Sequence, residues 1–365
     1  MNIKSLIPVV AKFFGATLMT KEATVDTLMG SELFFEEGEP ITIPPTKTWG
    51  IAPAEFEVKQ ENKSAGIGVF KLPTDQKIKI FNYGGIKMGG KVLNLDFGCS
   101  LFIKTLIQRD KRPVLEVENC IPLWSHFWGN GYYDYLFFVY AKFLRLASAL
   151  DKDTLSSVKI TYPIFNTSFE KELWKLAGIN EDQLIDSRKY KVKAKNYFVA
   201  NTQSWYYQHK TDIKLLQQTI QKVKVEVKPE YERIYISRKG RRKLLNEDAL
   251  IEVLKPLNFT VIEDTPRTVA EQMIIFNNAR IIVGPHGAAF TNILWCKPQA
   301  TLLELFPKNY YPPYFRALSA SLHINYAAVF EAGIQDTHFS HMNEDLTIDI
   351  PTVKKSVEEI IAGLK

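Results

Sequence analysis

The sequence of 365 residues has few cysteines, little excess of either charge and no long apolar run. Its three cysteines, Cys99, Cys120 and Cys296, are widely spaced, so no pair has the spacing of a metal or redox motif. The odd number also argues against a disulfide framework, and we expect a reducing compartment. No stretch reaches the ~20 consecutive apolar residues that a membrane-spanning helix needs.

The charge balance is close to neutral, with 46 Lys and Arg against 40 Asp and Glu. The resulting net charge of +6 mildly favours an anionic ligand, but it is too small for a protein that coats nucleic acid, so no nucleic-acid partner is expected. Apolar residues make up 46% and charged residues 24% of the chain, which excludes disorder and coiled coil as its main content. A chain of this length favours two domains.

Residues 1–30 are predicted to form a terminal helical segment, with Ser5 as its cap and Pro8 in its first turn. Apolar side chains recur there at helical spacing: Val10, Phe13, Phe14 and Leu18. The stripe has two interpretations. It packs on the body of the protein, or, with the nearby lysines, it forms a weak interfacial anchor on an anionic membrane.

Residues 31–228 are predicted to form an α/β domain. Between residues 22 and 75 no period is sustained and prolines recur, so we expect mostly loops there. Residues 131–150 have the pattern of one long apolar helix. Strand and helix patterns then alternate as far as a helix at 211–225, which is typical of a parallel sheet.

Residues 229–350 follow a linker and show the most regular pattern in the chain. Short apolar strands are expected at 233–238, 259–263, 280–284, 300–306 and 324–330. Helices are expected between them, at 246–255, 268–278, 287–295 and 314–322. This alternation predicts a doubly wound, Rossmann-like domain. Residues 351–365 are predicted to form a final helix.

Polar residues follow these strands at the edge where parallel sheets bind ligands, beyond the carboxyl ends. A cationic run, 238–243, follows the first strand, and His286 follows the third. Glu304 stands toward the end of the fourth. A run of charged residues alone is typical of a solvated surface. A single histidine is usually a structural residue whose hydrogen bonds are satisfied within the protein. Their convergence on one edge instead predicts a binding site.

This combination suits a nucleoside diphosphate. Arg238 and Arg242 offer planar, bidentate hydrogen bonds to phosphate oxygens. The amides of Gly287 and Ala288 would open a helix, where anions bind. Glu304 would hold ribose hydroxyls, as carboxylates do in dinucleotide folds, and His286 would hydrogen-bond the diphosphate or the sugar.

The order of these motifs resembles glycosyltransferase family 61. The matching elements are Ser237-Arg238, Arg242 through Asn246-Glu247, Glu271-Gln272, Gly284 through Asn292, and Glu304-Leu305. The resemblance covers about residues 231–310. It adds Asn246 and Asn292 to the candidate donor-binding residues, with Asn292 fixing the turn.

The resemblance implies a GT-B-like α/β fold, in which two Rossmann-like domains face a cleft. The 31–228 domain would bind the acceptor and the 229–350 domain a nucleotide sugar. It also implies an inverting transferase with no cofactor and no metal. An Asp-x-Asp pattern, which could bind a metal, occurs at Asp151-Lys152-Asp153. It follows the end of a predicted helix, so we interpret it as a capping turn.

The acceptor-side domain should supply the base that deprotonates the acceptor hydroxyl. The family carries an Asn-Tyr-Tyr-His segment there, and this chain has Asp134 where the family has His. Asp134 and His126 are the candidate bases. The alternatives are that Asp134 caps its helix and that His126 belongs to a packed aromatic cluster.

In this sequence no membrane anchor is visible, so the chain is more similar to bacterial members that act in capsule, lipopolysaccharide or exopolysaccharide synthesis. The expected partners are a nucleotide sugar, such as a UDP sugar, and a glycan or lipid-linked glycan acceptor. The expected location is the cytoplasm, with peripheral contact to the inner face of the membrane. Three rivals stay open: a polysaccharide pyruvyltransferase, a nucleotide-sugar epimerase, and a non-catalytic module that binds polyanions through residues 238–243.

Overall fold

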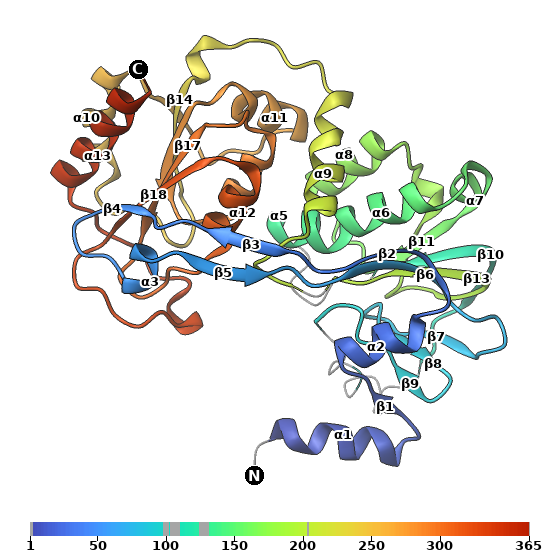
Figure 1. Cartoon of the computed structure of the whole chain (residues 1–365). Helices are drawn as coiled ribbons and strands as arrows, with labels where there is room; N and C mark the ends of the chain where they lie inside the picture. The colour runs from blue at the N-terminus through green and yellow to red at the C-terminus, as the bar shows by residue number, and fades with distance from the viewer. Residues whose placement is uncertain (1–2, 98–101, 103–109, 124–130, 203, 365) are drawn as a thin grey trace. The chain divides into compact units, whose positions relative to one another are not determined.

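The chain forms two compact units in the computed structural model. The structure describes residues 3–97, 102, 110–123, 131–202 and 204–364. The N-terminal unit comprises Met1–Glu39 and Ala65–Thr219, and the C-terminal unit comprises Pro40–Ser64 and Ile220–Lys365. Each unit is built on a sheet with parallel strands, which confirms the α/β class (Figure 1).

The N-terminal unit contains a six-stranded sheet in the order β12-β11-β10-β13-β6-β2. Its parallel strands are β12 (Leu184–Asp186), β11 (Lys159–Tyr162), β10 (Val114–Pro122) and β13 (Lys191–Ala200). Antiparallel β6 (Ile67–Lys71) and β2 (Glu32–Glu36) extend it. A smaller sheet joins β1 (Thr17–Leu18), β9 (Lys91–Val92), β8 (Ile86–Met88) and β7 (Ile78–Ile80).

The described helices of this unit lie in two stretches of the sequence, one before residue 30 and one between residues 132 and 218. They are α1 (Ile3–Phe13), α2 (Lys21–Leu28), α5 (Tyr132–Tyr135), the π-helix η2 (Leu136–Tyr140), α6 (Ala141–Ala149), α7 (Lys152–Ser157), α8 (Ser168–Ala177), η3 (Glu181–Gln183) and α9 (Lys210–Gln218). The long helix expected at 131–150 is thus interrupted by a π-helical segment. Asp151 caps α7 by accepting a hydrogen bond from the Thr154 amide at 2.8 Å, which confirms the capping turn.

The C-terminal unit contains a six-stranded, fully parallel sheet in the order β15-β14-β16-β17-β18-β4. The strands are β15 (Thr260–Ile262), β14 (Arg233–Ile236), β16 (Ile281–Pro285), β17 (Thr301–Phe306), β18 (Asn325–Phe330) and β4 (Lys47–Trp49). All residues of β16 and β17 are buried, as expected for strands covered on both faces. The alternation predicted after residue 229 is confirmed.

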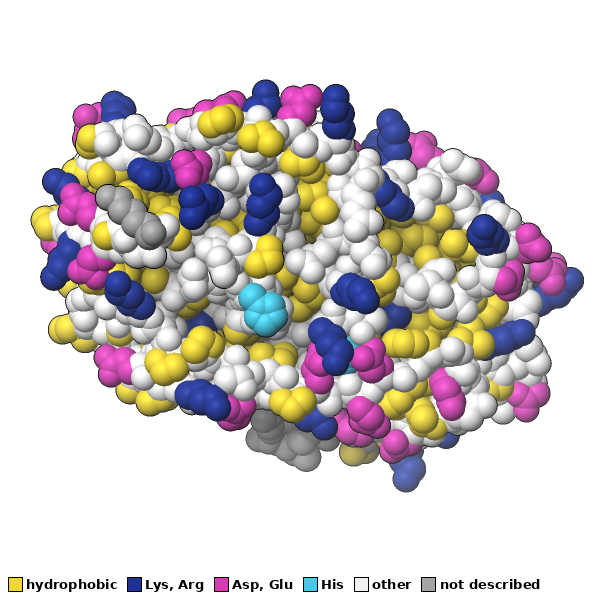
Figure 2. Space-filling view, turned by 45° about the horizontal axis from the view of Figure 1, so that its top comes forward, with side chains coloured by type: hydrophobic (Ala, Val, Ile, Leu, Met, Phe, Trp, Pro, Cys, Tyr) yellow, Lys and Arg dark blue, Asp and Glu magenta, His cyan; other side chains and the backbone are white. Residues whose placement is uncertain are grey.

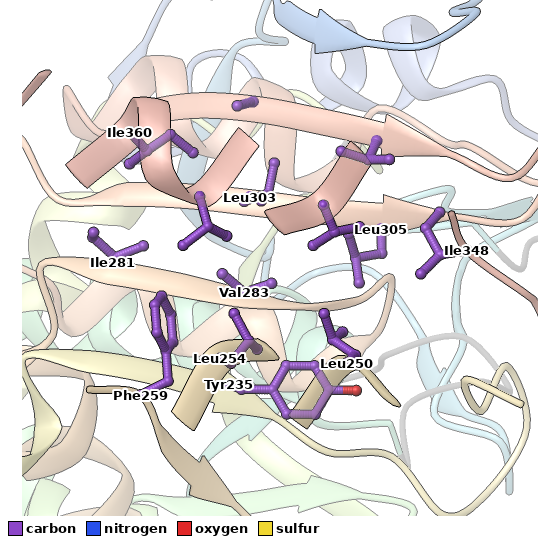
Figure 3. Packing of buried hydrophobic residues seen from close by; sticks show 14 of the residues in the cluster. Tyr235, Leu250, Leu254, Phe259, Ile281, Val283, Leu303, Leu305, Ile348 and Ile360 are labelled. Atoms are coloured by element: carbon purple, nitrogen blue, oxygen red, sulfur yellow. The ribbon is translucent and has the colours of Figure 1, made fainter. Parts of the chain in front are cut away.

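Helices cover this sheet, and short elements complete the unit. They are β3 (Pro40–Ile43), α3 (Ala54–Glu57), β5 (Gln60–Lys63), η4 (Thr219–Lys222), which begins at the boundary between the units, η5 (Pro229–Tyr231), α10 (Glu247–Leu254), η6 (Lys255–Leu257), α11 (Val269–Asn278), η7 (Ala288–Trp295), α12 (Tyr314–Leu322), η8 (Phe339–His341) and α13 (Ile350–Gly363). The helix expected at 287–295 is a 3-10 helix. Side chains of β14, β16 and β17 pack against α10 and α13 in one core (Figure 3).

Two expectations about the first 75 residues were wrong. The region 22–75 is not mostly loop, because it holds α2, α3 and β2 to β6. Residues 40–64 also do not belong with the rest of 31–228. Their strand β4 pairs in parallel with β18, and Arg316 Nη1 donates to the Glu55 carbonyl at 2.7 Å. These contacts tie the segment to the C-terminal unit, and α13 shares that unit's core, so 351–365 is no separate part.

Candidate active site

The C-terminal sheet reverses its strand order between β14 and β16. These strands are neighbours, but the chain goes from β14 to β15 on one side and reaches β16 on the other. Such a switch in direction leaves an opening where α/β sheets bind ligands. The loops that begin at Ser237 and at His286 both start there, so the structure brings together the two segments in which sequence analysis placed the phosphate site.

Two arginines of the first loop converge on one backbone oxygen of the second. Arg238 Nη1 and Arg242 Nε each donate to the His286 carbonyl at 3.1 Å. Arg242 Nη1 also donates to the Met342 carbonyl, and its guanidinium lies 5.4 Å from the centre of the Tyr310 ring. These contacts fix both guanidinium groups in one place.

The backbone of the cationic loop separates its inward-facing from its outward-facing side chains. Arg242 has a φ of 57°, an unusual conformation for a residue with a side chain, and it is 5% exposed. Its neighbours Arg241 and Lys243 are exposed. Lys239 and Lys243 form ion pairs with Glu263 (3.3 Å) and Asp345 (3.8 Å). Lys239, Arg241 and Lys243 therefore face the solvent. Arg238 and Arg242 are turned toward the protein instead.

Among the described residues, neither Arg238 nor Arg242 forms an ion pair, although both are largely buried. Burial, followed by the like charge of Arg238, lowers the pKa of Arg242 from its ordinary value to about 10. Burial and the charge of Arg241 likewise lower the pKa of Arg238, against a weaker opposing effect of Asp264. Buried charges in proteins are normally paired. Two adjacent buried cations without a carboxylate partner make this place suitable for a polyvalent anion.

His286 lies directly beneath these arginines and is held by a buried carboxylate. Its Nδ1 lies 2.5 Å from Oε1 of Glu304, and the Tyr326 hydroxyl donates to Oε2 of Glu304 at 2.6 Å. Burial raises the pKa of Glu304 to about 8. Burial and the charges of Arg242 and Arg238 hold the pKa of His286 well below its ordinary value.

This placement does not fit the predicted contact between Glu304 and ribose. The Glu304 side chain is fully buried, and its two oxygens already bond to His286 and Tyr326. Glu304 is the fourth residue of β17 and pairs in register with Gly284, which has no side chain, and with Ala328, which has only a methyl group. Its position allows the carboxylate to hold the His286 ring through Nδ1.

Aromatic rings surround the imidazole, and the sequence argument missed them. The ring centres of Phe306, Tyr310, Tyr314 and Phe315 lie between 5.3 and 6.0 Å from that of His286. All four follow or end β17, so the aromatic density at 306–315 was the signal that could have found them. They bury one face of the site and keep water away from the Glu304 carboxylate.

Small residues after β16 leave space for the arginines. A Cβ on Gly287 would lie 1.5 Å from Arg238 Nη1, so any larger residue would displace this guanidinium. Ala288 is half-buried and Ala289 exposed at the start of η7, next to the arginines. The segment thus offers backbone to a ligand without bulky side chains in between.

Two predicted donor-binding asparagines have structural contacts instead. The Asn246 side chain donates to the Ile348 carbonyl at 2.8 Å and accepts from the Ile348 amide at 3.3 Å. Asn292 is buried and ties the turn of η7 together, donating to Gln272 Oε1 and the Ala289 carbonyl and accepting from Trp295 Nε1. The turn-fixing role expected of Asn292 therefore agrees with its contacts, while Asn246 anchors the segment before α13.

Asp134, the first of the two predicted bases, lies in the N-terminal unit. Asp134 is half-buried in the first turn of α5, and Gly131 is the residue that precedes this helix as its cap position. The alternative that Asp134 is the N-cap is therefore wrong. His126 lies outside the described residues. Within the described part of the chain, no group of three or more His, Cys, Asp or Glu side chains could hold a metal ion, and no helix has the length and apolarity to cross a bilayer.

Comparison with known proteins connects this site to one family. Residues 92–303, more than half of the chain, match the family described as Glycosyltransferase 61. The match contains β14, β16, Arg238, Arg242 and His286, together with much of the N-terminal unit. A segment of 74 residues is 31% identical to Xylan glycosyltransferase MUCI21 of Arabidopsis thaliana. The aligned part is 20% of this chain and 15% of the plant protein.

Proposed function

This chain belongs to glycosyltransferase family 61, and on that premise we propose that it transfers a sugar from a nucleotide-sugar donor to a glycan acceptor. The observation that carries the proposal is the pair formed by buried Arg242 and half-buried Arg238, neither of which has a carboxylate in an ion pair among the described residues. Both stand at the switch point of a parallel sheet, where nucleotides bind in such folds. A diphosphate supplies the negative charge that this pair lacks.

The proposed fold is a GT-B-like arrangement in which the C-terminal unit binds the donor and the N-terminal unit the acceptor. The support is that each unit carries parallel strands, and that the family match extends over both. The fully parallel sheet with the arginines belongs to the C-terminal unit. The donor assignment therefore follows from the anion site.

The proposed reaction is an inverting displacement. An acceptor oxygen attacks the anomeric carbon, the bond from this carbon to the phosphate oxygen breaks, and its electron pair leaves with the nucleoside diphosphate. Negative charge grows on the leaving group, so the fixed charges of Arg238 and Arg242 stabilise the transition state more than the ground state. The acceptor proton passes to a base, for which Asp134 is the first candidate and His126 the second.

His286 is proposed to bind the donor through its second ring nitrogen. Its Nδ1 is engaged by Glu304, and among the described residues no group bonds to Nε2. Glu304 and Tyr326 then act as positioning residues, because they hold the ring through Nδ1 and touch no ligand themselves. The surrounding aromatic rings restrict the ring further and strengthen its polar contacts by excluding water.

The finer assignments are proposals of the same kind. UDP as the carrier nucleotide, a bacterial surface-polysaccharide pathway, a cytoplasmic location and independence from metals come from the sequence resemblance alone. The plant relative is named a xylan glycosyltransferase, which favours a polysaccharide acceptor. The family match disfavours the pyruvyltransferase and epimerase alternatives. The charged side chains on the face shown in Figure 2 are of mixed sign, which gives no support there to a general polyanion-binding module.

A thermal-shift screen against nucleotide sugars and free nucleotides tests this proposal. A ligand that binds only the folded protein raises its melting temperature with increasing occupancy. We expect stabilisation by one class of nucleoside diphosphate that persists at 150 mM salt, a condition set to suppress nonspecific polyanion binding. Stabilisation only by heparin-like polyanions, lost at moderate salt, would support the polyanion-binding alternative and overturn the transferase proposal.

A further inference from the structure

Helix α1 is fixed to the small sheet of the N-terminal unit by a narrow contact. Ala11 and Ala16 are buried in a cluster with Phe81, Val92 and Phe102. The backbone reinforces this contact, because the Thr17 amide donates to the Gly90 carbonyl at 2.8 Å where β1 pairs with β9. The family match begins at residue 92, so this helix lies before it.

Apolar side chains in the last turns of α1, and Phe14 in the turn directly after it, face outward. Phe13 is 86% exposed, Val9 65%, Phe14 52% and Val10 39%. Val9 and Phe13 are four residues apart, so they lie on one side of the helix. Phe14 follows in the turn that ends the helix, where its amide donates to the Val10 carbonyl at 3.3 Å. Single exposed apolar residues are ordinary, but a contiguous helical patch with two phenylalanines indicates an interaction surface.

The sequence segments that form α1 and the small sheet carry basic residues and no acidic ones. Residues 1–21 contain Lys4, Lys12 and Lys21 and no acidic residue. Residues 77–93, which contain the other strands of the small sheet, carry Lys77, Lys79, Lys87 and Lys91 and again no acidic residue. The nearest acidic residue beyond α1 in the sequence is Glu22, in α2.

Contacts of the described residues bring part of this charge close to the exposed apolar side chains. Lys87 Nζ donates to the Gly15 carbonyl at 3.2 Å, directly after the end of α1. Lys91 pairs in register with Thr17, and Lys12 is exposed on the helix itself. The Lys87 ammonium group therefore lies at the end of α1 that carries the phenylalanines.

We infer that α1 and the lysines of the small sheet form a docking surface for an anionic lipid bilayer. Phenylalanine side chains would enter the boundary between headgroups and acyl chains, while the lysines contact the anionic headgroups. A second copy of this chain fits the surface less well, since it would bring lysines against lysines. This inference stands on α1 and the small sheet, and it does not depend on the transferase proposal.

Sedimentation of the full chain with lipid vesicles tests the inference. Vesicles of phosphatidylcholine alone are compared with vesicles that contain 30% phosphatidylglycerol, at low salt and at 0.5 M NaCl. We expect binding to the anionic vesicles, weakened by salt, and little binding to the neutral ones. Phe13→Ser should lower the partition coefficient by about tenfold or more, because it removes one large apolar side chain from the interface.

Matched variants separate this surface from general stickiness. Phe339→Ser removes a phenylalanine that is 57% exposed in the C-terminal unit, and it should leave vesicle binding unchanged. Lys87→Glu should weaken binding to anionic vesicles, whereas Lys152→Glu, at an exposed position on α7, should have little effect. Phe13 is exposed, so we expect its variant to melt at the wild-type temperature.

Three results would overturn the inference. The first is no binding to anionic vesicles, and the second is equal binding to neutral and anionic vesicles. The third is a dimer in solution that Phe13→Ser dissociates, which would show that a second copy covers α1.

Discussion

Replacement of Arg242 by methionine should separate ligand affinity from stability. Arg242 is 5% exposed, and in the free protein its pKa is lowered from its ordinary value to about 10. This shift corresponds to roughly 3 kcal/mol of unfavourable free energy for the charged form. Methionine keeps much of the volume and removes this penalty, but it also takes the Arg242 donor from the Met342 carbonyl and one of the two arginine donors from the His286 carbonyl, which keeps the hydrogen bond from Arg238. These losses, about 1–3 kcal/mol each, offset the gain, so we expect little net change in the free energy of unfolding.

The effect on ligand binding should be much larger. A hydrogen bond to a charged group contributes roughly 1.5–3 kcal/mol, so the affinity for the nucleoside diphosphate found in the screen should fall about 10- to 150-fold. Titration calorimetry measures the affinity and urea unfolding the stability. Lys243→Met is the matched control, since Lys243 is exposed and paired with Asp345, and it should leave both quantities unchanged. An Arg242→Met protein with wild-type affinity would refute the diphosphate site.

Three further substitutions test the other parts of the account. Because the raised pKa of Glu304 makes the native state bind more protons than the unfolded state between about pH 4.5 and 8, Glu304 lowers stability as pH rises through this window. Glu304→Gln should flatten that decline in pH-dependent unfolding and slow sugar transfer, and an unchanged pH profile would contradict the assignment. Asp134→Asn should abolish transfer with little change in donor affinity, and an active variant would remove Asp134 from the mechanism and leave His126 as the next candidate. Gly287→Ala should weaken diphosphate binding, measured by calorimetry, because its Cβ displaces the Arg238 guanidinium; Gly240→Ala, in open space in the same loop, should bind normally.

The C-terminal sheet could be predicted well because its strands are short, apolar and covered on both faces. β16 and β17 are buried along their whole length, so their sequences are apolar apart from Thr301 and Glu304 of β17. β4 could not be predicted in this way. Its three residues, Lys47–Trp49, have no strand pattern of their own, and they form a strand only because they pair with β18 far along the chain. The same long-range pairing explains why residues 40–64 were assigned to the wrong part of the chain.

The candidate site was predicted in its position and only partly in its contacts. Parallel strands gather the residues that follow them at one edge, so Arg238 and His286 were expected to lie close together. Which side chains turn inward depends on the loop conformation, and the positive φ of Arg242 has no signature in the sequence. The bond between His286 and Glu304 depends on the register of β16 against β17, in which Gly284 stands opposite Glu304. Sequence periodicity does not define such a register.

The most direct test of the central claim is a crystal structure of the protein with the nucleoside diphosphate selected by the thermal-shift screen. The account predicts that the diphosphate lies beyond the carboxyl ends of β14 and β16, with phosphate oxygens within hydrogen-bonding distance of the Arg238 and Arg242 guanidinium groups. The account would be contradicted if the nucleotide were bound elsewhere and the two arginines contacted only protein carbonyls, as they do in the free protein.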